Sequence, residues 1–180
     1  MRSDASRSRT AILEAARVLI AEPGELKLSA VAKKAGVGQG TLYRHFTTRD
    51  ELVAALYTGE IDELVVEANR LLEHHEPLPA LEVWLGRLAA YAQVKRGVIE
   101  AVDSSVWAEI SAQTHTKLGQ ALGALLTAGA EADVLRADIE PRDVILLSWF
   151  LAHVKPEEWD DRVPRLLDVL LKGLRPTDAR

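Results

Sequence analysis

Residues 28–50 read LSAVAKKAGVGQGTLYRHFTTRD, and the pattern of this stretch indicates how the N-terminal part of the chain folds. A short helix is predicted at its start, because Val31 and Ala35 lie four residues apart on one helical face. Ser29 stands where the N-cap of that helix is expected. Gly36 should end the helix, since glycine accepts the left-handed conformation that a tight turn needs. The stretch therefore opens with a capped helix and a sharp turn.

A second short helix is predicted over 39–46, with Leu42 and Phe46 four residues apart on its inner face. The apolar face of a helix over 7–21 would supply the third wall of a small core. Two short helices joined by a tight turn form a helix-turn-helix, whose last helix can enter the major groove of DNA. The polar side chains that should then point outward are Gln39, Tyr43 and Arg44.

Helical periodicity continues to the end of the chain, and no strand signal or internal repeat is found. Thr48 and Glu51 have the spacing of a capping box and should begin a long helix that ends near residue 74. Further helices are predicted over about 80–94, 96–102, 111–130, 141–153 and 161–174. We therefore expect an all-α fold of about nine helices, with a helix-turn-helix domain over 1–47 and a regulatory and dimerisation domain over 48–180.

The composition excludes several classes of protein. The chain has 180 residues, of which 48% are hydrophobic and none is cysteine. A core can therefore form, whereas a disulfide scaffold, a thiolate zinc site and a cysteine nucleophile are excluded. No run of about 18 apolar residues is present, so we expect no membrane partner and a cytoplasmic location.

Charge is distributed unevenly along the chain. The net charge is −5, yet residues 1–50 hold 9 basic and 5 acidic residues, whereas the remainder holds 13 and 22. A basic N-terminal part on an acidic body predicts that only the N-terminal part meets a polyanion. Chance unevenness is the alternative explanation.

Four segments carry a resemblance to a known family: Ser29–Ala32, Ala35–Val37, Gly40–Phe46 and Asp50–Leu52. Together they resemble the DNA-binding domain of TetR-family regulators, and the likeness spans residues 7–56. Residues 78–175 are similar to the ligand-binding domain of the SbtR-like branch of that family. The segments that carry this second similarity are Pro77–Leu81, Lys95–Gly97, Pro141–Asp143 and Gly173–Arg175.

The resemblance implies a homodimeric transcription factor, usually a repressor, whose recognition helices read a palindromic operator in double-stranded DNA. A small-molecule effector in the second domain would release the DNA. Positions that match base contacts or base-or-phosphate contacts of the family are Gln39, Gly40, Tyr43 and Arg44. Positions that match phosphate contacts are Ser29, Thr41, His45 and Arg49, the last where the family more often has lysine. Gly38 replaces the serine or threonine of many relatives, so one hydroxyl contact is missing.

An aromatic stripe is a candidate lining of the ligand pocket, because Trp84, Leu88 and Tyr91 share one helical face. All four tryptophans lie within residues 81–180, which favours a pocket, although plain core explains such a stripe equally well. Candidate polar anchors for a mostly apolar site are Gln93, Asp103 and His115. The candidate ligand-binding residues are Trp84, Leu88, Tyr91, Asp103, Trp107, His115, Leu118, Leu122 and Trp149.

The helices over 141–153 and 161–174 are expected to be apolar nearly all round, which requires burial on more than one side. A second copy of the chain, packed through this pair as a four-helix bundle, would bury them. An ordinary core position in a monomer is the alternative. The candidate dimerisation residues are Leu147, Phe150, Leu151, Leu166, Leu167, Leu170 and Leu174.

Signals for other functions are weak, so we expect neither an enzyme nor a cofactor or metal site. The Gly36-x-Gly38-x-Gly40 pattern lacks the preceding strand of a dinucleotide-binding loop. His74 and His75 are adjacent, so they cannot both face one metal site on a helix. The other alternative is a dimeric helical receptor whose DNA-reading part has decayed, and the intact outward polar residues argue against it.

Overall fold

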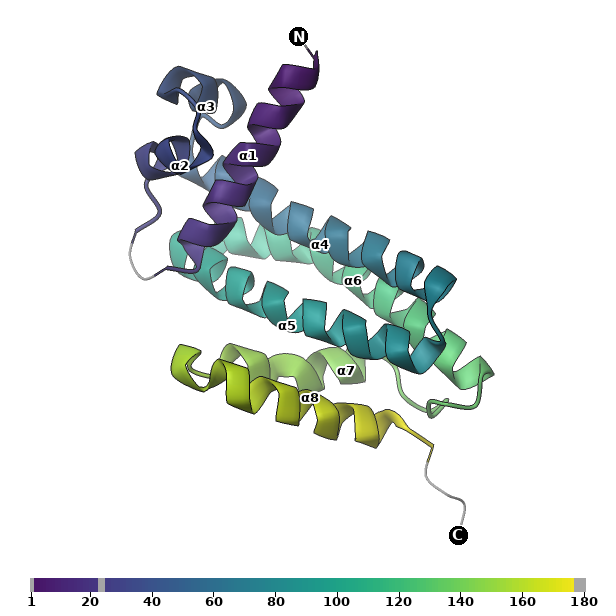
Figure 1. Ribbon diagram of the computed structural model, residues 1–180. Helices are drawn as coiled ribbons and strands as arrows, with labels where there is room; N and C mark the ends of the chain where they lie inside the picture. The colour runs from purple at the N-terminus through teal and green to yellow at the C-terminus, as the bar shows by residue number, and fades with distance from the viewer. Residues whose placement is uncertain (1, 23–24, 177–180) are drawn as a thin grey trace. The chain divides into compact units, whose positions relative to one another are not determined.

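The computed structural model describes residues 2–22 and 25–176, and every regular element in these ranges is helical (Figure 1). Eight α-helices, where about nine were expected, and two short 3₁₀ helices make up the all-α fold that the sequence predicts. None of the helices in these ranges is long and apolar enough to cross a membrane. The elements are α1 (Arg2–Ile20), α2 (Leu28–Ala35), α3 (Gln39–His45), α4 (Arg49–His74), α5 (Pro77–Ala101), α6 (Ser104–Glu131), α7 (Pro141–Leu147), η1 (Ser148–Ala152), η2 (Pro156–Glu158) and α8 (Trp159–Leu174).

The middle of the chain is more continuously helical than the sequence predicts. One helix, α5, replaces the two expected over 80–94 and 96–102. Pro77 begins α5, three residues before the expected start near 80, because proline lacks only an N–H that the first turn leaves unpaired. Helix α6 begins at Ser104, seven residues before the expected start at 111.

The chain forms two compact units, each made of two separate stretches of the sequence. Unit 1 comprises Met1–Glu60 and Val94–Ala112, and unit 2 comprises Ile61–Gln93 and Gln113–Arg180. The start of α4, the end of α5 and the start of α6 therefore group with the helix-turn-helix. Helices α4, α5 and α6 each contribute residues to both units.

The core of unit 1 forms where α2 and α3 pack on α1 (Figure 1). Ile12 and Val31 are fully buried, and Leu42 and Phe46 are 1% and 4% exposed. Burying one such side chain contributes about 1.5–3 kcal/mol. A partly buried ion pair also joins α1 to α4, with Arg17 Nε 2.5 Å from a Glu60 carboxylate oxygen.

Gly97 permits a close approach of α5 to the end of α1 within unit 1. A Cβ added at Gly97 would lie well inside 3.0 Å of the Ile20 carbonyl oxygen. No side chain fits between these two backbones, so glycine is needed here for its size alone.

Unit 2 is built on parts of α4, α5 and α6. Trp84 is fully buried on α5, and its indole N–H donates a 2.9 Å hydrogen bond to the Leu64 carbonyl of α4. Lys117 of α6 forms a 2.6 Å exposed ion pair with Asp62 of α4. Helices α7 and α8 lie along α5 (Figure 1), where Ala89 packs with Leu151 of η1 and Val163 of α8.

The last helix is not apolar all round, which corrects the sequence-based prediction for residues 161–174. Helix α7 ends at Leu147, and the chain continues as the 3₁₀ helix η1. Helix α8 is amphipathic: Val163, Leu170, Leu171 and Leu174 are buried. Ion pairs cover other parts of its surface, as in Arg165–Asp161 at 2.8 Å and Lys172–Asp168 at 2.6 Å.

Substituting Gly97 by alanine should lower the free energy of unfolding by about 1–3 kcal/mol, because the new methyl group overpacks the contact with Ile20. Gly86→Ala on the same helix is the control. No atom lies within 4 Å of a Cβ at Gly86, so this change should raise helix stability by about 0.5–1 kcal/mol. Urea unfolding of both variants measures the difference, and equal effects would contradict the close packing at Gly97.

Candidate nucleic-acid interface

The turn between α2 and α3 is held by backbone hydrogen bonds. Gly36 has a left-handed φ of 67°, and its N–H donates to the Lys33 carbonyl at 3.2 Å. The next N–H, that of Val37, donates to the Ala32 carbonyl at 3.0 Å. These bonds satisfy carbonyls at the end of α2 and reverse the chain, as the sequence predicts for Gly36.

The start of α2 differs from the prediction, because Lys27 and not Ser29 is the N-cap residue. The N–H groups of Ala30 and Val31 donate to the Lys27 carbonyl at 3.0 and 3.1 Å. The helix therefore begins two residues earlier than expected. Ser29 lies exposed in the first turn, where its hydroxyl is accessible to a partner.

Helix α3 presents a polar surface opposite its buried side. Leu42 and Phe46 point into the core, as expected, and Tyr43 is 50% exposed. Three further candidate contact residues are exposed: Gln39, Gly40 and Arg44. The remaining candidates on α3, Thr41 and His45, are half-buried.

Arg44 is bonded along the surface of its own helix. Its Nε donates to the Gly40 carbonyl at 3.1 Å, and a terminal nitrogen lies 3.5 Å from the Thr41 hydroxyl. Because a guanidinium carries five N–H donors, Arg44 retains donors for an anion. This arrangement pre-orders the side chain on the exposed face of α3.

The surface around α2 and α3 is basic. Residues 28–46 contain Lys33, Lys34 and Arg44 but no aspartate or glutamate. All three basic side chains are exposed. Such a surface attracts phosphates without sequence preference.

Gly40 is not required by the fold itself. No atom lies within 4 Å of a Cβ built at this position, and the residue is exposed. Glycine inside a helix nevertheless costs about 1 kcal/mol relative to alanine. A glycine that the chain does not need is typical of a surface that another molecule approaches closely.

The start of α4 is capped by two threonines. The Thr48 hydroxyl accepts the Glu51 N–H at 3.1 Å, which is one half of the predicted capping box. The Glu51 carboxylate instead reaches Thr47, accepting its hydroxyl at 2.8 Å and its N–H at 2.7 Å. Hydrogen bonds from the Thr47 hydroxyl and backbone hold the pKa of Glu51 below its usual value.

Arg49 is engaged within unit 1. Its guanidinium donates to the Ala101 carbonyl at the end of α5 and lies 3.5 Å from a Glu25 carboxylate oxygen. The side chain is 34% exposed. The structure therefore gives this candidate phosphate contact a set of partners inside the protein.

Comparison with known proteins places this geometry in a family. Residues 12–56 match a family model described as bacterial regulatory proteins of the tetR family, and residues 76–176 match the C-terminal domain of SbtR-like transcriptional regulators. A solved TetR transcriptional regulator from Streptomyces coelicolor is 36% identical to this chain, with a TM-score of 0.83 over 94% of this chain and 99% of its own. The chain belongs to the TetR family of bacterial transcriptional regulators.

Two further relatives agree with this assignment. A TetR transcription regulatory protein from Mycobacterium vanbaalenii is 30% identical, with a TM-score of 0.78 over 97% of this chain and 99% of its own. A helix-turn-helix transcriptional regulator of Staphylococcus aureus is 26% identical over 107 residues, which is 58% of this chain and 58% of that protein. The chain thus matches just over half the length of that relative. TetR-family proteins are regulators and not enzymes.

The candidate ligand-binding residues of this TetR-family chain do not form one set. Asp103 and Trp107 belong to unit 1, and the other seven belong to unit 2. Packed core positions of unit 2 are Trp84, Leu88, Tyr91, Leu118 and Leu122. Two others in unit 2 are exposed: His115 and, at 61%, Trp149.

Trp107 lies in an aromatic cluster of unit 1. Its ring meets Tyr57 edge-on at 5.1 Å, and the Lys95 ammonium lies 5.7 Å from its centroid. Burial lowers the pKa of Lys95, because the charged form loses hydration. The indole face thus compensates part of that loss.

The candidate dimerisation residues also divide. Leu151, Leu170 and Leu174 are buried within the chain itself, and Phe150, Leu166 and Leu167 are partly buried against a cluster around Val163. Leu147 alone of the seven is among the large exposed apolar side chains of the described residues. Sequence reasoning missed two exposed residues of the same region, Leu146 and Val169, and placed a third, Trp149, in the ligand pocket.

Substituting Glu51 by glutamine should destabilise the protein at neutral pH and have less effect in acid. A carboxyl whose pKa is lowered by folding stabilises the fold above its unfolded pKa of about 4.3, and this stabilisation is lost as the pH falls through the lower folded value. Urea unfolding of wild type and variant between pH 7 and pH 3 measures the difference. Glu131→Gln, at an exposed carboxylate, is the control, and a pH-independent effect of Glu51→Gln would contradict the capping role.

Proposed function

We propose that this TetR-family chain is a homodimeric, ligand-responsive DNA-binding regulator, most simply a repressor of a palindromic operator. The observation that carries the proposal is the surface of α2 and α3. It is basic, free of acidic residues over 28–46, and presents Gln39, Tyr43 and Arg44 outward from a buried helix-turn-helix core. These are the features that a helix needs to enter the major groove.

The exposed residues divide by chemistry into base readers and phosphate binders. The Gln39 amide can form two hydrogen bonds with adenine, and Gly40 lets the backbone come close to base edges. Arg44, Tyr43 and Ser29 carry donors that suit phosphate oxygens. Thr41 and His45, which are half-buried, would contact the backbone only at the margin of the interface.

Arg49 fits a supporting role better than a phosphate contact. Its guanidinium already binds the Ala101 carbonyl and faces Glu25. We infer that it holds the end of α5 against the start of α4 inside unit 1. Moving it to a phosphate would break both interactions.

A second copy of the chain would cover an apolar patch in unit 2, which we name the dimer face. Its members are exposed by 43% to 65% although they are large and apolar: Leu146, Leu147, Trp149 and Val169. Large apolar side chains that a chain's own fold leaves exposed are typical of protein interfaces. Two-fold pairing through this face would supply two recognition helices for two half-sites about 34–36 Å apart or a multiple of that spacing.

Regulation by a small molecule follows from the shared helices. Because α4, α5 and α6 each contribute residues to both units, a ligand that changes their packing in unit 2 can bias the state of unit 1. The free energy of operator binding then becomes less favourable. The change is set by the difference between the ligand's binding free energies for the DNA-binding state and the released state.

The test begins with recovery of genomic fragments by the purified protein from the DNA of its own organism at a stated salt concentration. A few strong sites that share one palindrome would support the proposal, and the neighbouring genes would suggest candidate effectors. Diffuse recovery that disappears with salt would contradict it, because non-specific binding depends on phosphates alone. The receptor with a decayed DNA-reading part would then be the better explanation.

Replacing Arg44 by methionine should weaken operator binding and reduce the slope of log affinity against log salt by about one unit per subunit. Arg49→Met is the matched variant. It should leave that slope nearly unchanged and instead lower the free energy of unfolding by about 1–3 kcal/mol, because it removes hydrogen bonds of a charged group. Fluorescence anisotropy at several salt concentrations and urea unfolding separate the two effects. Equal loss of slope in both variants would assign Arg49 to the DNA.

Val169→Asp should shift the protein towards monomer, because it places a charge in the dimer face. Val66→Asp on α4 is the matched control, since both valines are 65% exposed. Sedimentation velocity over a concentration series measures the monomer fraction. A dimer that withstands Val169→Asp, or that Val66→Asp disrupts to the same degree, would contradict this interface.

A further inference from the structure

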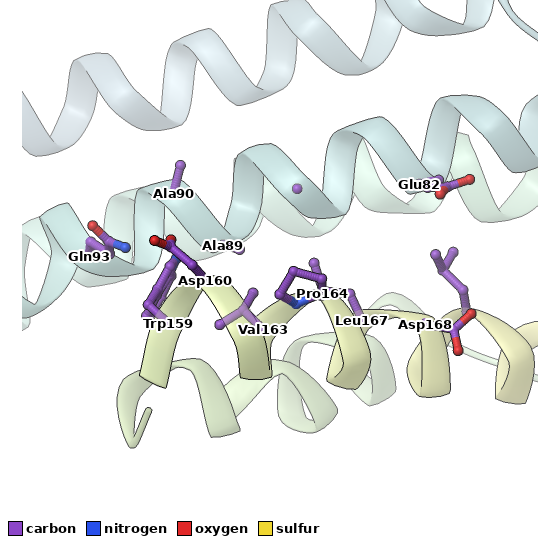
Figure 2. A pocket seen from close by; sticks show the side chains of 12 residues that line it. Glu82, Ala89, Ala90, Gln93, Trp159, Asp160, Val163, Pro164, Leu167 and Asp168 are labelled. Carbon is purple, nitrogen blue, oxygen red and sulfur yellow. The ribbon is translucent and has the colours of Figure 1, made fainter. Parts of the chain in front are cut away.

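A groove between α5 and α8 lies wholly within unit 2 and includes no residue of the dimer face (Figure 2). Its volume is about 490 Å³, within the range of small-molecule sites. Gln93 is the one residue of the groove that the sequence singled out as a polar anchor for a ligand. The groove is therefore large enough for a small-molecule ligand. Of its lining residues, sequence reasoning had found only Gln93 as a candidate for ligand binding.

The residues that α5 contributes to the groove between Glu82 and Gln93 are small. Gly86, Ala89 and Ala90 line the groove from α5. Val163 and Leu167 line it from α8 (Figure 2). Ala89 and Val163, each 4% exposed, form the floor. A flat apolar group would bury its surface here without displacing a long side chain.

The charged residues of the groove are all acidic. Its lining contains Glu82, Asp160 and Asp168 but no lysine, arginine or histidine. Asp168 is paired with Lys172 at 2.6 Å, at an exposed position. In the part of the chain that the structure describes, the side-chain carboxylates of Glu82 and Asp160 have no ion-pair or hydrogen-bond partner. A cation in the groove would supply the charge that these two carboxylates lack.

An aromatic ring stands beside one of these carboxylates. Trp159 and Asp160 lie at the end of the groove near Gln93, whereas Glu82 and Asp168 lie towards the other end (Figure 2). Trp159 is partly buried against the cluster of Ala89 and Val163, which fixes its position. An indole face next to a carboxylate attracts organic cations through both the ring quadrupole and the charge.

We propose that this groove binds an organic cation, namely a flat apolar ring system that carries an amine or quaternary ammonium group. The ring lies between the small residues of α5 and the apolar residues of α8, and the cationic group faces Asp160 and Trp159 or Glu82. The binding claim stands on the groove alone. The further claim that this ligand regulates DNA binding rests on the proposed function.

Two probes with the same ring and opposite charge test the proposal on the full chain. Isothermal titration calorimetry compares 2-naphthylmethylammonium with 2-naphthoate. We expect the cation to bind more tightly by about tenfold or more, since the carboxylates attract one probe and repel the other. Equal affinities, or tighter binding of the naphthoate, would overturn the proposal.

Variants then locate the site. The double change Glu82→Gln with Asp160→Asn should weaken the cation by about fivefold or more, while Glu131→Gln, an exposed carboxylate outside the groove, should not. Gly86→Leu should abolish binding by filling the groove, and no atom lies within 4 Å of a Cβ there to oppose folding. Circular dichroism checks the fold. Unchanged affinity in Gly86→Leu or in the double variant would place the cation elsewhere and overturn the proposal.

Two further readouts separate this proposal from its alternatives. If Gly86→Leu turns a dimer into a monomer in sedimentation velocity, a second copy covers the groove and the ligand proposal fails. A separate experiment measures the affinity of the protein for the operator with and without 2-naphthylmethylammonium. Groove binding that leaves DNA affinity unchanged would refute only the regulatory role, whereas absence of any specific operator would refute the proposed function and leave the calorimetric result standing.

Discussion

The turn at Gly36 is the constraint on which the DNA-reading surface depends. A left-handed φ of 67° is open to glycine, whereas a Cβ there costs about 1–2 kcal/mol. Because the N–H groups of Gly36 and Val37 both bond back into α2, the chain reverses within two residues and sets α3 against α1. Leu42 is then buried and Tyr43 exposed on the same short helix. A wider turn would leave Leu42 without a core and rotate the polar face of α3 away from solvent.

Local chemistry made the N-terminal half of the fold predictable from sequence. The end of α2 at Gly36, the inward side of α3 and the start of α4 near Thr48 all follow from signals within a few residues, and the structure confirms them. The cap of α2 was wrong because the serine hydroxyl is only one way to satisfy a helix start. Here Lys27 is the N-cap residue, its carbonyl accepts the N–H groups of Ala30 and Val31, and no side-chain cap is formed. The roles of Gln39 and Tyr43 towards DNA stay predictions.

Long-range packing set the limit of prediction in the C-terminal half. Sequence reasoning counted apolar residues on α8 as a reason for dimerisation, yet Leu170, Leu171 and Leu174 are buried by the chain's own fold. The exposure of each side chain in the folded structure is needed to show which apolar residues stay available for an interface, and Leu147 and Val169 are two of them. The partners of Arg49 were hidden for the same reason, since Ala101 lies 52 residues away in the sequence. No periodicity within one helix reports such contacts.

Helix α8 links the two proposals made for unit 2. Successive residues of an α-helix are separated by about 100°, so Val169 lies about 200° around the axis from Leu167. Leu167 lines the groove and Val169 belongs to the proposed dimer face, so the two proposals place the ligand and a second copy on opposite sides of one helix. Pro164, which also lines the groove, cannot donate an N–H to the Asp160 carbonyl, and this loosens α8 at that turn. If both proposals hold, a ligand wedged against α5 would bend α8 at this turn and shift the residues of the proposed dimer face. In that arrangement, occupancy of the groove and the spacing of the two recognition helices are not independent.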